Sequence, residues 1–214
     1  PKIQIIGVEP AGAACMKASM EAGHVVGLPE VDTIADGTAV KMPGDLQFPY
    51  IQENVDEIIT VEDSELIVAF LDMVENHKMI VENSGLLTVA ALKHMDVKKK
   101  KIVSILSGGN MDVITMASIV QHGLILRDRV FTVSVLLPDK PGELARVSAI
   151  LAEIQANVIK LEHNQFVSLN RNAAVELRIT MEAFGTEHKR EIVETLNDHG
   201  YRPTLAKGSG TYND

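Results

Sequence analysis

Three short polar turns carry the side chains best suited to binding or chemistry. The strongest is Ser107–Gly108–Gly109–Asn110, which directly follows the apolar run Ile102–Leu106. If that run is a strand of a parallel sheet, its carboxyl end is where ligands bind. A Ser-Gly-Gly turn offers a hydroxyl, open backbone N–H groups and close approach to the backbone. Taken alone, the motif is equally well explained as a tight turn without a ligand.

The other two turns have comparable alternatives. Thr33–Ile34–Ala35–Asp36–Gly37 lies inside a long loop, and Gly37 would allow a flat ring to rest against the backbone. An ordinary Asp-Gly turn explains the same residues. Glu82–Asn83–Ser84–Gly85 precedes an apolar helix, so Glu82 is a candidate site carboxylate, whereas Asn83 or Ser84 is a candidate helix cap.

The elements that must position these turns follow the alternation of strands and helices that is typical of a parallel sheet. We expect residues 1–126 to form this α/β part, with a functional loop over Leu28–Gln52. The expected strands are Ile3–Val8, Asp56–Val61 and the buried strand Ile102–Leu106. The expected helices are Ala11–Ala22, Glu62–Asn76 and Ser84–His94.

Residues 127–214 follow a different order, which is β-α-β-β-α-β, the ferredoxin-like arrangement. The expected strands are Val130–Leu137, Ala156–Phe166, Ala173–Met181 and Tyr201–Leu205, with helices from Pro141 to about Ile154 and over Thr186–His199. Gln165–Asn172 is expected to be a polar hairpin, and Lys207–Asp214 a frayed tail.

Composition narrows the classes of function. The 214 residues carry a net charge of −9, which disfavours phosphate backbones and therefore nucleic acid as the main partner. The ferredoxin-like order also occurs in RNA-binding domains, but Ala173–Met181 has no aromatic residue for base stacking. The basic run Lys98–Lys101 is expected to be a solvated turn. No apolar run is long enough to span a membrane, and the single cysteine, Cys15, is best explained as a buried apolar residue.

Together and in order, the turns of the first part resemble the C-terminal half of the fold-type II (tryptophan synthase β-like) pyridoxal-phosphate enzymes, in the threonine dehydratase and serine racemase branch. The resemblance rests on six segments: Ile5–Pro10, Thr33–Gly37, Val40–Gly44, Val55–Val61, Val81–Gly85 and Leu106–Asp112.

This resemblance implies a role for several residues. Ser107, beside Gly108, would donate a hydrogen bond to the pyridine nitrogen of pyridoxal phosphate, and such a neutral partner favours β-elimination. Gly37 would lie against one face of the ring, and Glu82 would lie close to the site.

The resemblance also has gaps. Serine racemase-like members bind a divalent metal, and Glu9 and Ala13 match two of its ligands, but Cys15 stands where the family has an aspartate. No metal is therefore assigned. The Schiff-base lysine and the glycine-rich phosphate cup of the family precede the matched region, so no catalytic residue is assigned in this chain. Because the chain opens at Pro1 directly before an apparent core strand, we expect it to be cut from a longer polypeptide.

Residues 127–214 resemble an ACT domain, a ferredoxin-like module that senses amino acids. The resemblance rests on Leu137–Leu144 between the first strand and the first helix. It implies that the helix start at Pro141, Gly142, Glu143 and Leu144 binds the carboxylate of an effector, for which isoleucine and valine are the candidates. A helix cap without a ligand is the alternative.

The two resemblances imply part of a cytoplasmic, PLP-dependent threonine ammonia-lyase of isoleucine biosynthesis. Threonine or serine would be its substrate, the ACT domain would regulate it allosterically, and it would assemble as a homo-dimer or homo-tetramer. A stand-alone, non-catalytic protein that binds an amino acid through its ACT domain is the alternative.

Overall fold

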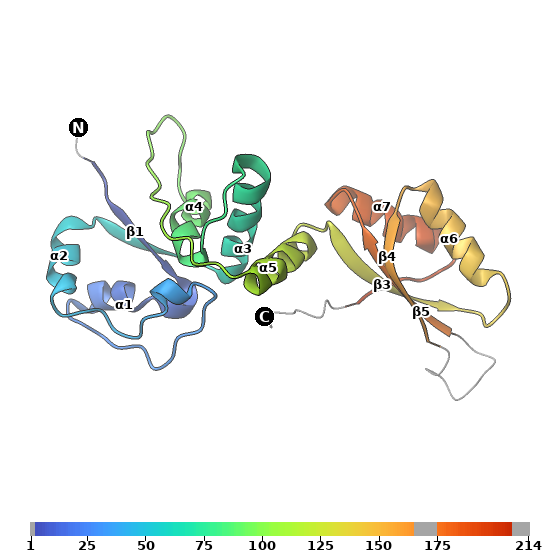
Figure 1. Ribbon diagram of the computed structural model, residues 1–214, viewed down its shortest axis with the longest axis horizontal. Coiled ribbons are helices and arrows are strands. Elements are labelled where there is room, and N and C mark those ends of the chain that lie inside the picture. Colours follow the sequence, from blue (N-terminus) through green and yellow to red (C-terminus); the bar gives the residue numbers. More distant parts are fainter. Residues whose placement is uncertain (1–2, 165–174, 207–214) are drawn as a thin grey trace. The chain divides into compact units, whose positions relative to one another are not determined.

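The chain consists of two compact units, Pro1–Gly123 and Leu124–Asp214. A computed structural model describes residues 3–164 and 175–206 (Figure 1). The expected hairpin Gln165–Asn172 and the expected tail Lys207–Asp214 lie outside the described residues. No helix in the described ranges is both long and apolar enough to cross a membrane.

The first unit is a small parallel sheet with helices around it. Strand β1 (Ile6–Pro10) pairs in parallel with β2 (Glu57–Val61), and Val8 lies opposite Ile59. The helices are α1 (Cys15–Ala22), α2 (Gln47–Asn54), α3 (Asp63–Asp72), α4 (Leu87–Ala90) and most of α5 (Val113–Leu126), whose last three residues belong to the second unit.

Helix α3 supplies the centre of this unit's core. Leu66, Ala69 and Phe70 lie on one face and are almost completely buried, because residues three and four apart share a face of a helix. Its first turn is closed by a capping box between Glu62 and Glu65. The helix ends at Asp72 and continues as one π-helical turn, Met73–His77.

Two details differ from the expectations for this unit. Helix α2 begins at Gln47, inside the stretch Leu28–Gln52 that was expected to be loop. The predicted buried strand Ile102–Leu106 is wrong, because these residues pair with no strand and Val103 is 89% exposed. A strand needs a neighbour for its backbone groups, and the described residues provide none here.

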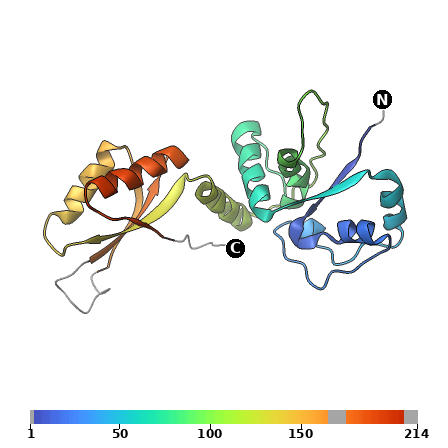
Figure 2. The ribbon, with the colours of Figure 1, turned by 180° about the vertical axis from the view of Figure 1, so that it is seen from behind.

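The second unit has the expected ferredoxin-like fold. Its elements are β3 (Val130–Leu137), α6 (Glu143–Glu153), β4 (Asn157–Asn164), β5 (Val175–Glu182), α7 (Thr186–Asp198) and β6 (Thr204–Leu205). The antiparallel sheet has the order β4-β5-β3-β6. Both helices cover one face of this sheet (Figures 1 and 2).

Strict alternation along the central strands builds the core of this unit. On β3, Val133, Val135 and Leu137 are buried, whereas Leu136 between them is exposed. On β5, Leu177 and Ile179 are fully buried in the same layer. One face of the sheet therefore forms the core under the helices, and the other carries polar side chains.

A partly buried ion pair fixes the start of α7 in this unit. Asp128 accepts hydrogen bonds from the Thr186 hydroxyl at 2.8 Å and from the Lys189 ammonium at 2.5 Å, and Lys189 also lies 5.7 Å from the centre of the Phe131 ring. Partial burial raises the pKa of Asp128, but the hydrogen bonds and the Lys189 charge outweigh it and hold this pKa below its ordinary value.

We predict that Asp128→Asn lowers the free energy of unfolding at pH 7 by about 1–3 kcal/mol, because a partly buried ammonium loses its charged partner. Because the pKa of Asp128 is lower in the folded protein than in the unfolded chain, the charged carboxylate stabilises the fold at pH values above the pKa of the unfolded chain, about 3.9. This stabilisation is lost as the pH falls through the pKa of the folded protein. The difference from wild type should therefore shrink below about pH 4. Urea unfolding at pH 7 and pH 3 measures it, with exposed Asp198→Asn as the control. A difference that is equal at both pH values would contradict the assignment.

Candidate functional site

The three polar turns predicted from the sequence meet in the first unit. A Cβ placed on Gly37 would lie 2.8 Å from the Ser84 Oγ, and one placed on Gly108 would lie 2.1 Å from the Glu82 carboxyl group. The Glu82 Oε2 accepts a hydrogen bond from the Asn110 N–H at 3.0 Å. Residues that are up to 73 positions apart in the sequence, Gly37 and Asn110, therefore belong to one cluster.

Gly85 permits the closest approach in this cluster. A Cβ at this position would lie 1.7 Å from the carbonyl oxygen of Ser107, far inside van der Waals contact. Only glycine allows the turn at Glu82–Gly85 to touch the turn at Ser107–Asn110 in this way.

The Thr33–Gly37 loop is anchored from two sides. The Asp63 carboxylate accepts hydrogen bonds from the Thr33 hydroxyl at 2.6 Å and from the Ile34 N–H at 2.9 Å. The Asn83 side-chain amide donates to the Ile34 carbonyl at 2.9 Å. The sequence indicated neither Asp63 nor Asn83 as an anchor of this loop, because each stands near the start of an expected helix, where such residues commonly cap the helix.

The interpretation of Asn83 or Ser84 as a helix cap is wrong. The short 3-10 helix Asn83–Leu86 has no side-chain cap hydrogen bond, because the Asn83 amide reaches across to Ile34 instead. Asn83 is buried, and its Oδ1 has no hydrogen-bond partner among the described residues. A buried acceptor without a hydrogen-bond donor destabilises the folded protein, so a bound group or a water molecule is expected to donate to this oxygen.

Ser107 and its glycines form the open side of the cluster. Ser107, Gly108 and Gly109 are exposed, and Gly108 has a φ of +77°. Within the described ranges the Ser107 hydroxyl makes no hydrogen bond, so it is available to a ligand. A hydroxyl donor beside open glycine backbone suits a flat ring that carries a nitrogen acceptor at its edge.

Glu9 and Cys15 do not join this cluster. Both Glu9 oxygens accept hydrogen bonds from the start of α1, from the Met16 N–H at 2.9 Å and from the Lys17 N–H at 2.8 Å. Cys15 is buried as expected, and burial together with the Glu9 charge raises its pKa. Such a thiol stays protonated and is a poor nucleophile. The described part of the chain has no group of three metal-binding side chains.

In the second unit, the predicted effector loop forms an open helix start. Gly142 is the N-cap of α6 with a φ of +94°, and Pro141 and Gly142 are exposed. Glu143 begins the helix and pairs with Arg146 at 3.0 Å, while the Tyr201 hydroxyl donates to its other oxygen at 3.4 Å. Burial and the Glu143 charge raise the pKa of Tyr201. Leu144 is the next helical residue and is also exposed.

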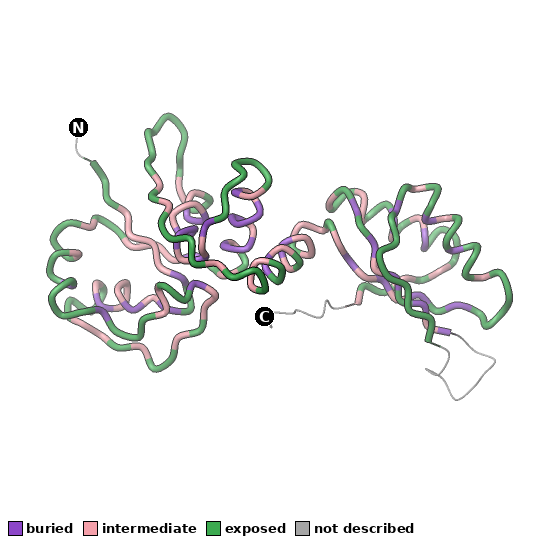
Figure 3. Tube along the Cα trace, viewed as in Figure 1, coloured by how far each residue is buried: buried purple, intermediate pink, exposed green. Residues whose placement is uncertain are grey.

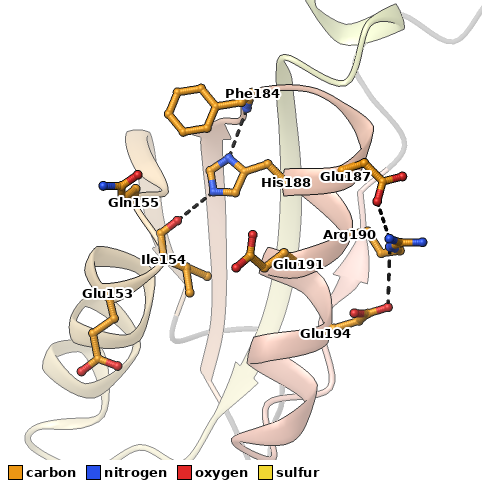
Figure 4. Close-up of a pocket in the computed structure, with 9 residues that line it drawn as sticks. All are labelled: Glu153, Ile154, Gln155, Phe184, Glu187, His188, Arg190, Glu191 and Glu194. Carbon is orange, nitrogen blue, oxygen red and sulfur yellow. Dashed lines mark hydrogen bonds and ion pairs between the residues drawn. The ribbon is translucent and has the colours of Figure 1, made fainter.

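A pocket that sequence analysis did not predict lies at the other end of α6 (Figure 4). Its centre is His188, which stacks on Phe184 with ring centres 4.8 Å apart. The His188 Nδ1 accepts a hydrogen bond from the Phe184 N–H, and its Nε2 lies 2.7 Å from the Ile154 carbonyl. The contact with Ile154 requires a proton on Nε2 and joins the end of α6 to the start of α7. The imidazole is therefore explained by packing and hydrogen bonding, so the pocket is not assigned as a ligand site.

Comparison with known proteins identifies the family. Residues 1–108 match the model of the pyridoxal-phosphate-dependent enzymes. The chain belongs to this family. It is 38% identical to the L-threonine ammonia-lyase of Geobacter sulfurreducens over 209 residues, which are 97% of the chain and 52% of that protein. It is 31% identical to the biosynthetic L-threonine dehydratase IlvA of Escherichia coli over 205 residues, 94% of the chain and 39% of that protein.

A solved structure gives the same result. The processed form of threonine deaminase isoform 2 from Solanum lycopersicum is 36% identical, with a TM-score of 0.51 over 55% of this chain and 36% of that one. The chain spans about half the length, or less, of the curated relatives it matches.

The cluster of turns fits the family's cofactor, pyridoxal phosphate. Ser107 offers a hydroxyl without a partner in the described residues, Gly37 offers backbone without a side chain, and the buried Asn83 Oδ1 lacks a donor. These are the features that an aromatic heterocycle with polar edges requires of a binding site.

We predict that Gly108→Ala destabilises the first unit by about 1–2 kcal/mol, because its left-handed backbone disfavours a Cβ and that atom would strike Glu82. The Asn110 amide should then exchange its hydrogen faster, since its acceptor is displaced. Gly109→Ala is the matched control, because nothing lies within 4 Å of a Cβ there. Urea unfolding and amide exchange measure both variants, and equal effects would refute the predicted contact.

Proposed function

We propose that the chain is part of a pyridoxal-phosphate-dependent threonine ammonia-lyase, which converts L-threonine to 2-oxobutanoate and ammonia. Its main support is the meeting of Gly37, Glu82 and Ser107–Asn110 in one cluster that the family resemblance assigns to the cofactor. The names of the relatives support the choice of substrate within the family.

Residues 1–126 would supply one side of the cofactor site. The Ser107 hydroxyl would donate to the pyridine nitrogen, and Gly37 would lie against a face of the ring. Glu82 would hold the Gly108–Asn110 backbone through its bond to the Asn110 N–H. When bound, pyridoxal phosphate stabilises the negative charge that forms as the α-proton of the amino acid is removed.

The proton transfer itself needs residues outside this segment. The family resemblance places the cofactor-linked lysine and the phosphate-binding turn in the part of the protein that precedes the matched region. The residues of this chain therefore bind and orient, and we assign no catalytic residue to them.

Residues 127–214 would be the regulatory domain. The N–H groups at the open start of α6, around Gly142 and Glu143, would bind the carboxylate of isoleucine or valine. The resemblance further implies a homo-oligomer, a role in isoleucine biosynthesis and a cytoplasmic location.

We predict that Ser107→Ala in the full-length enzyme weakens cofactor binding by roughly 2–10-fold, the effect of one lost hydrogen bond, and also lowers turnover. Equilibrium dialysis of pyridoxal phosphate and formation of 2-oxobutanoate from threonine measure the two effects. Ser104→Ala is the control, because Ser104 faces Thr88 in the same segment. If Ser107→Ala left both quantities at wild-type values, the assignment of Ser107 would be wrong.

We predict that Gly142→Val abolishes binding of isoleucine or valine, because a branched side chain at a φ of +94° distorts the open helix start. Calorimetric titration of the chain with each amino acid measures this. Gly185→Val introduces a similar strain at a φ of +122°, outside the predicted site, and should retain binding. Retained binding in Gly142→Val would exclude this loop as the effector site. Effector binding by a full-length protein that neither binds pyridoxal phosphate nor consumes threonine would favour the stand-alone regulatory alternative.

A further inference from the structure

The Thr33–Gly37 loop is held at Ile34 by side chains that bind both sides of its backbone. The Ile34 N–H donates to the Asp63 Oδ2 at 2.9 Å, and the Ile34 carbonyl accepts from the Asn83 side-chain amide at 2.9 Å. The Thr33 hydroxyl donates to the other Asp63 oxygen, Oδ1, at 2.6 Å. Both oxygens of the Asp63 carboxylate are therefore used by this loop.

Asp63 is available to the loop because its own helix is capped by other residues. Helix α3 begins at Asp63, but its N-cap is Glu62, and the Glu62 N–H donates to the Glu65 Oε2 at 2.9 Å in the capping box. An acidic residue in the first turn usually contributes only a favourable charge near the helix dipole. The hydrogen bonds of Asp63 to the loop point to a second role, outside its helix.

Helix α3 gives this carboxylate a rigid support. Leu66 and Phe70, which follow Asp63 on the same helix, are completely buried in the core of the first unit. Figure 3 shows the buried stretch of α3 in purple. Side chains that are carried by well-packed helices are placed more precisely than those carried by loops. Asp63 therefore fixes the position of the Ile34 backbone relative to this core.

Short hydrogen bonds extend this fixed position from Ile34 to Gly37. The Ala35 N–H donates to the Thr33 Oγ1 at 3.1 Å, and Ala35 is completely buried. The Thr38 N–H and the Thr38 hydroxyl both donate to the Ala35 carbonyl at 2.9 Å, which closes the 3-10 turn that contains Gly37. A shift of Ile34 would therefore also move Gly37.

We propose that Asp63 is a positioning residue for the cofactor, because it sets where Gly37 lies relative to the ring of pyridoxal phosphate. Asp63 acts through the backbone of the Thr33–Gly37 loop, and we assign it no contact with the ring or the substrate. The proposal rests on the proposed function, in which Gly37 lies against one face of the ring. When Asp63 no longer holds the loop, this contact loosens and the cofactor binds less tightly.

The test compares Asp63→Ala with Asp63→Asn in the full-length protein. Alanine removes both acceptors, whereas the asparagine carbonyl can accept from the Ile34 N–H and its amide can donate to the Thr33 hydroxyl oxygen. Both variants remove the same charge near the start of α3, so a difference between them reports the hydrogen bonds to the loop. Ser64→Ala, at the next residue of the same turn, is the control because Ser64 is exposed.

We expect Asp63→Ala to release the loop and to weaken cofactor binding. Amide hydrogen exchange at Ile34 in the cofactor-free protein should become roughly tenfold faster. The dissociation constant of pyridoxal phosphate, measured by equilibrium dialysis, should rise about fivefold, the effect of one lost hydrogen bond. The circular dichroism of the bound cofactor, which reports how the ring is held, should also change. Asp63→Asn should stay within about twofold of the wild-type affinity, and Ser64→Ala should match the wild type.

Three results would overturn the proposal. Unchanged exchange at Ile34 in Asp63→Ala would mean that the loop is held without Asp63. Wild-type affinity and dichroism together with a lower stability in urea would make Asp63 a residue of the fold alone. Equal losses in Asp63→Asn and Asp63→Ala would assign the effect to charge and not to hydrogen bonding.

The wild-type protein separates these results from a failure of the proposed function. If it bound no pyridoxal phosphate, the proposed function would be refuted, and the role of Asp63 with it. If it bound the cofactor but did not deaminate threonine, the proposed substrate would be wrong, and the comparison of Asp63→Ala with Asp63→Asn would still decide the role of Asp63.

Discussion

The contact between Gly85 and the Ser107 carbonyl is the constraint on which the candidate site depends. Since any side chain at position 85 would overlap that oxygen, the distance between the two turns is set by the absence of a Cβ. Because the turns are so close, the Glu82 carboxylate accepts a hydrogen bond from the Asn110 N–H, and Gly108 lies in contact with the same carboxylate. Asn83, two residues before Gly85, donates a hydrogen bond to the Ile34 carbonyl and so holds the Thr33–Gly37 loop against the same turn. The site is therefore built from backbone contacts that glycine permits, with few side chains involved.

Local periodicity made the second unit predictable. The alternation on Val130–Leu137 fixes which side chains face the helices, and the structure has the strand at the predicted bounds. In the first unit, the expected helix Glu62–Asn76 is present as α3 and the π-helical turn that follows it. Helix α2 was missed because Pro49 suggests a loop, yet in the first turn of a helix proline removes no needed hydrogen bond.

The sequence was less informative where an outcome depends on distant residues. The pattern of Ile102–Leu106 predicted a buried strand, but a buried strand needs a neighbouring strand, and the described residues provide none beside this segment. Likewise, the three turns were identifiable as polar turns, whereas their meeting depends on folds of the chain between positions 37 and 82 and between 85 and 107. Asn83 was expected to cap a helix but instead donates a hydrogen bond to the Ile34 carbonyl. This contact also could not be predicted from local sequence, because only the tertiary structure brings Ile34 near.

The two candidate sites differ in how a ligand can act on them. In the first unit the ligand would complete an unfinished structure, because the buried Asn83 Oδ1 lacks a donor in the described residues and Ser107 faces outward. In the second unit the core of Leu177, Ile179 and Leu196 is fully buried, and the proposed effector site at Gly142 is exposed. A ligand shifts an equilibrium only by its difference in affinity for two states. Because a closely packed core resists small rearrangements, we expect those states to differ in exposed elements, such as the open start of α6 and the edge strand β4, every residue of which is exposed.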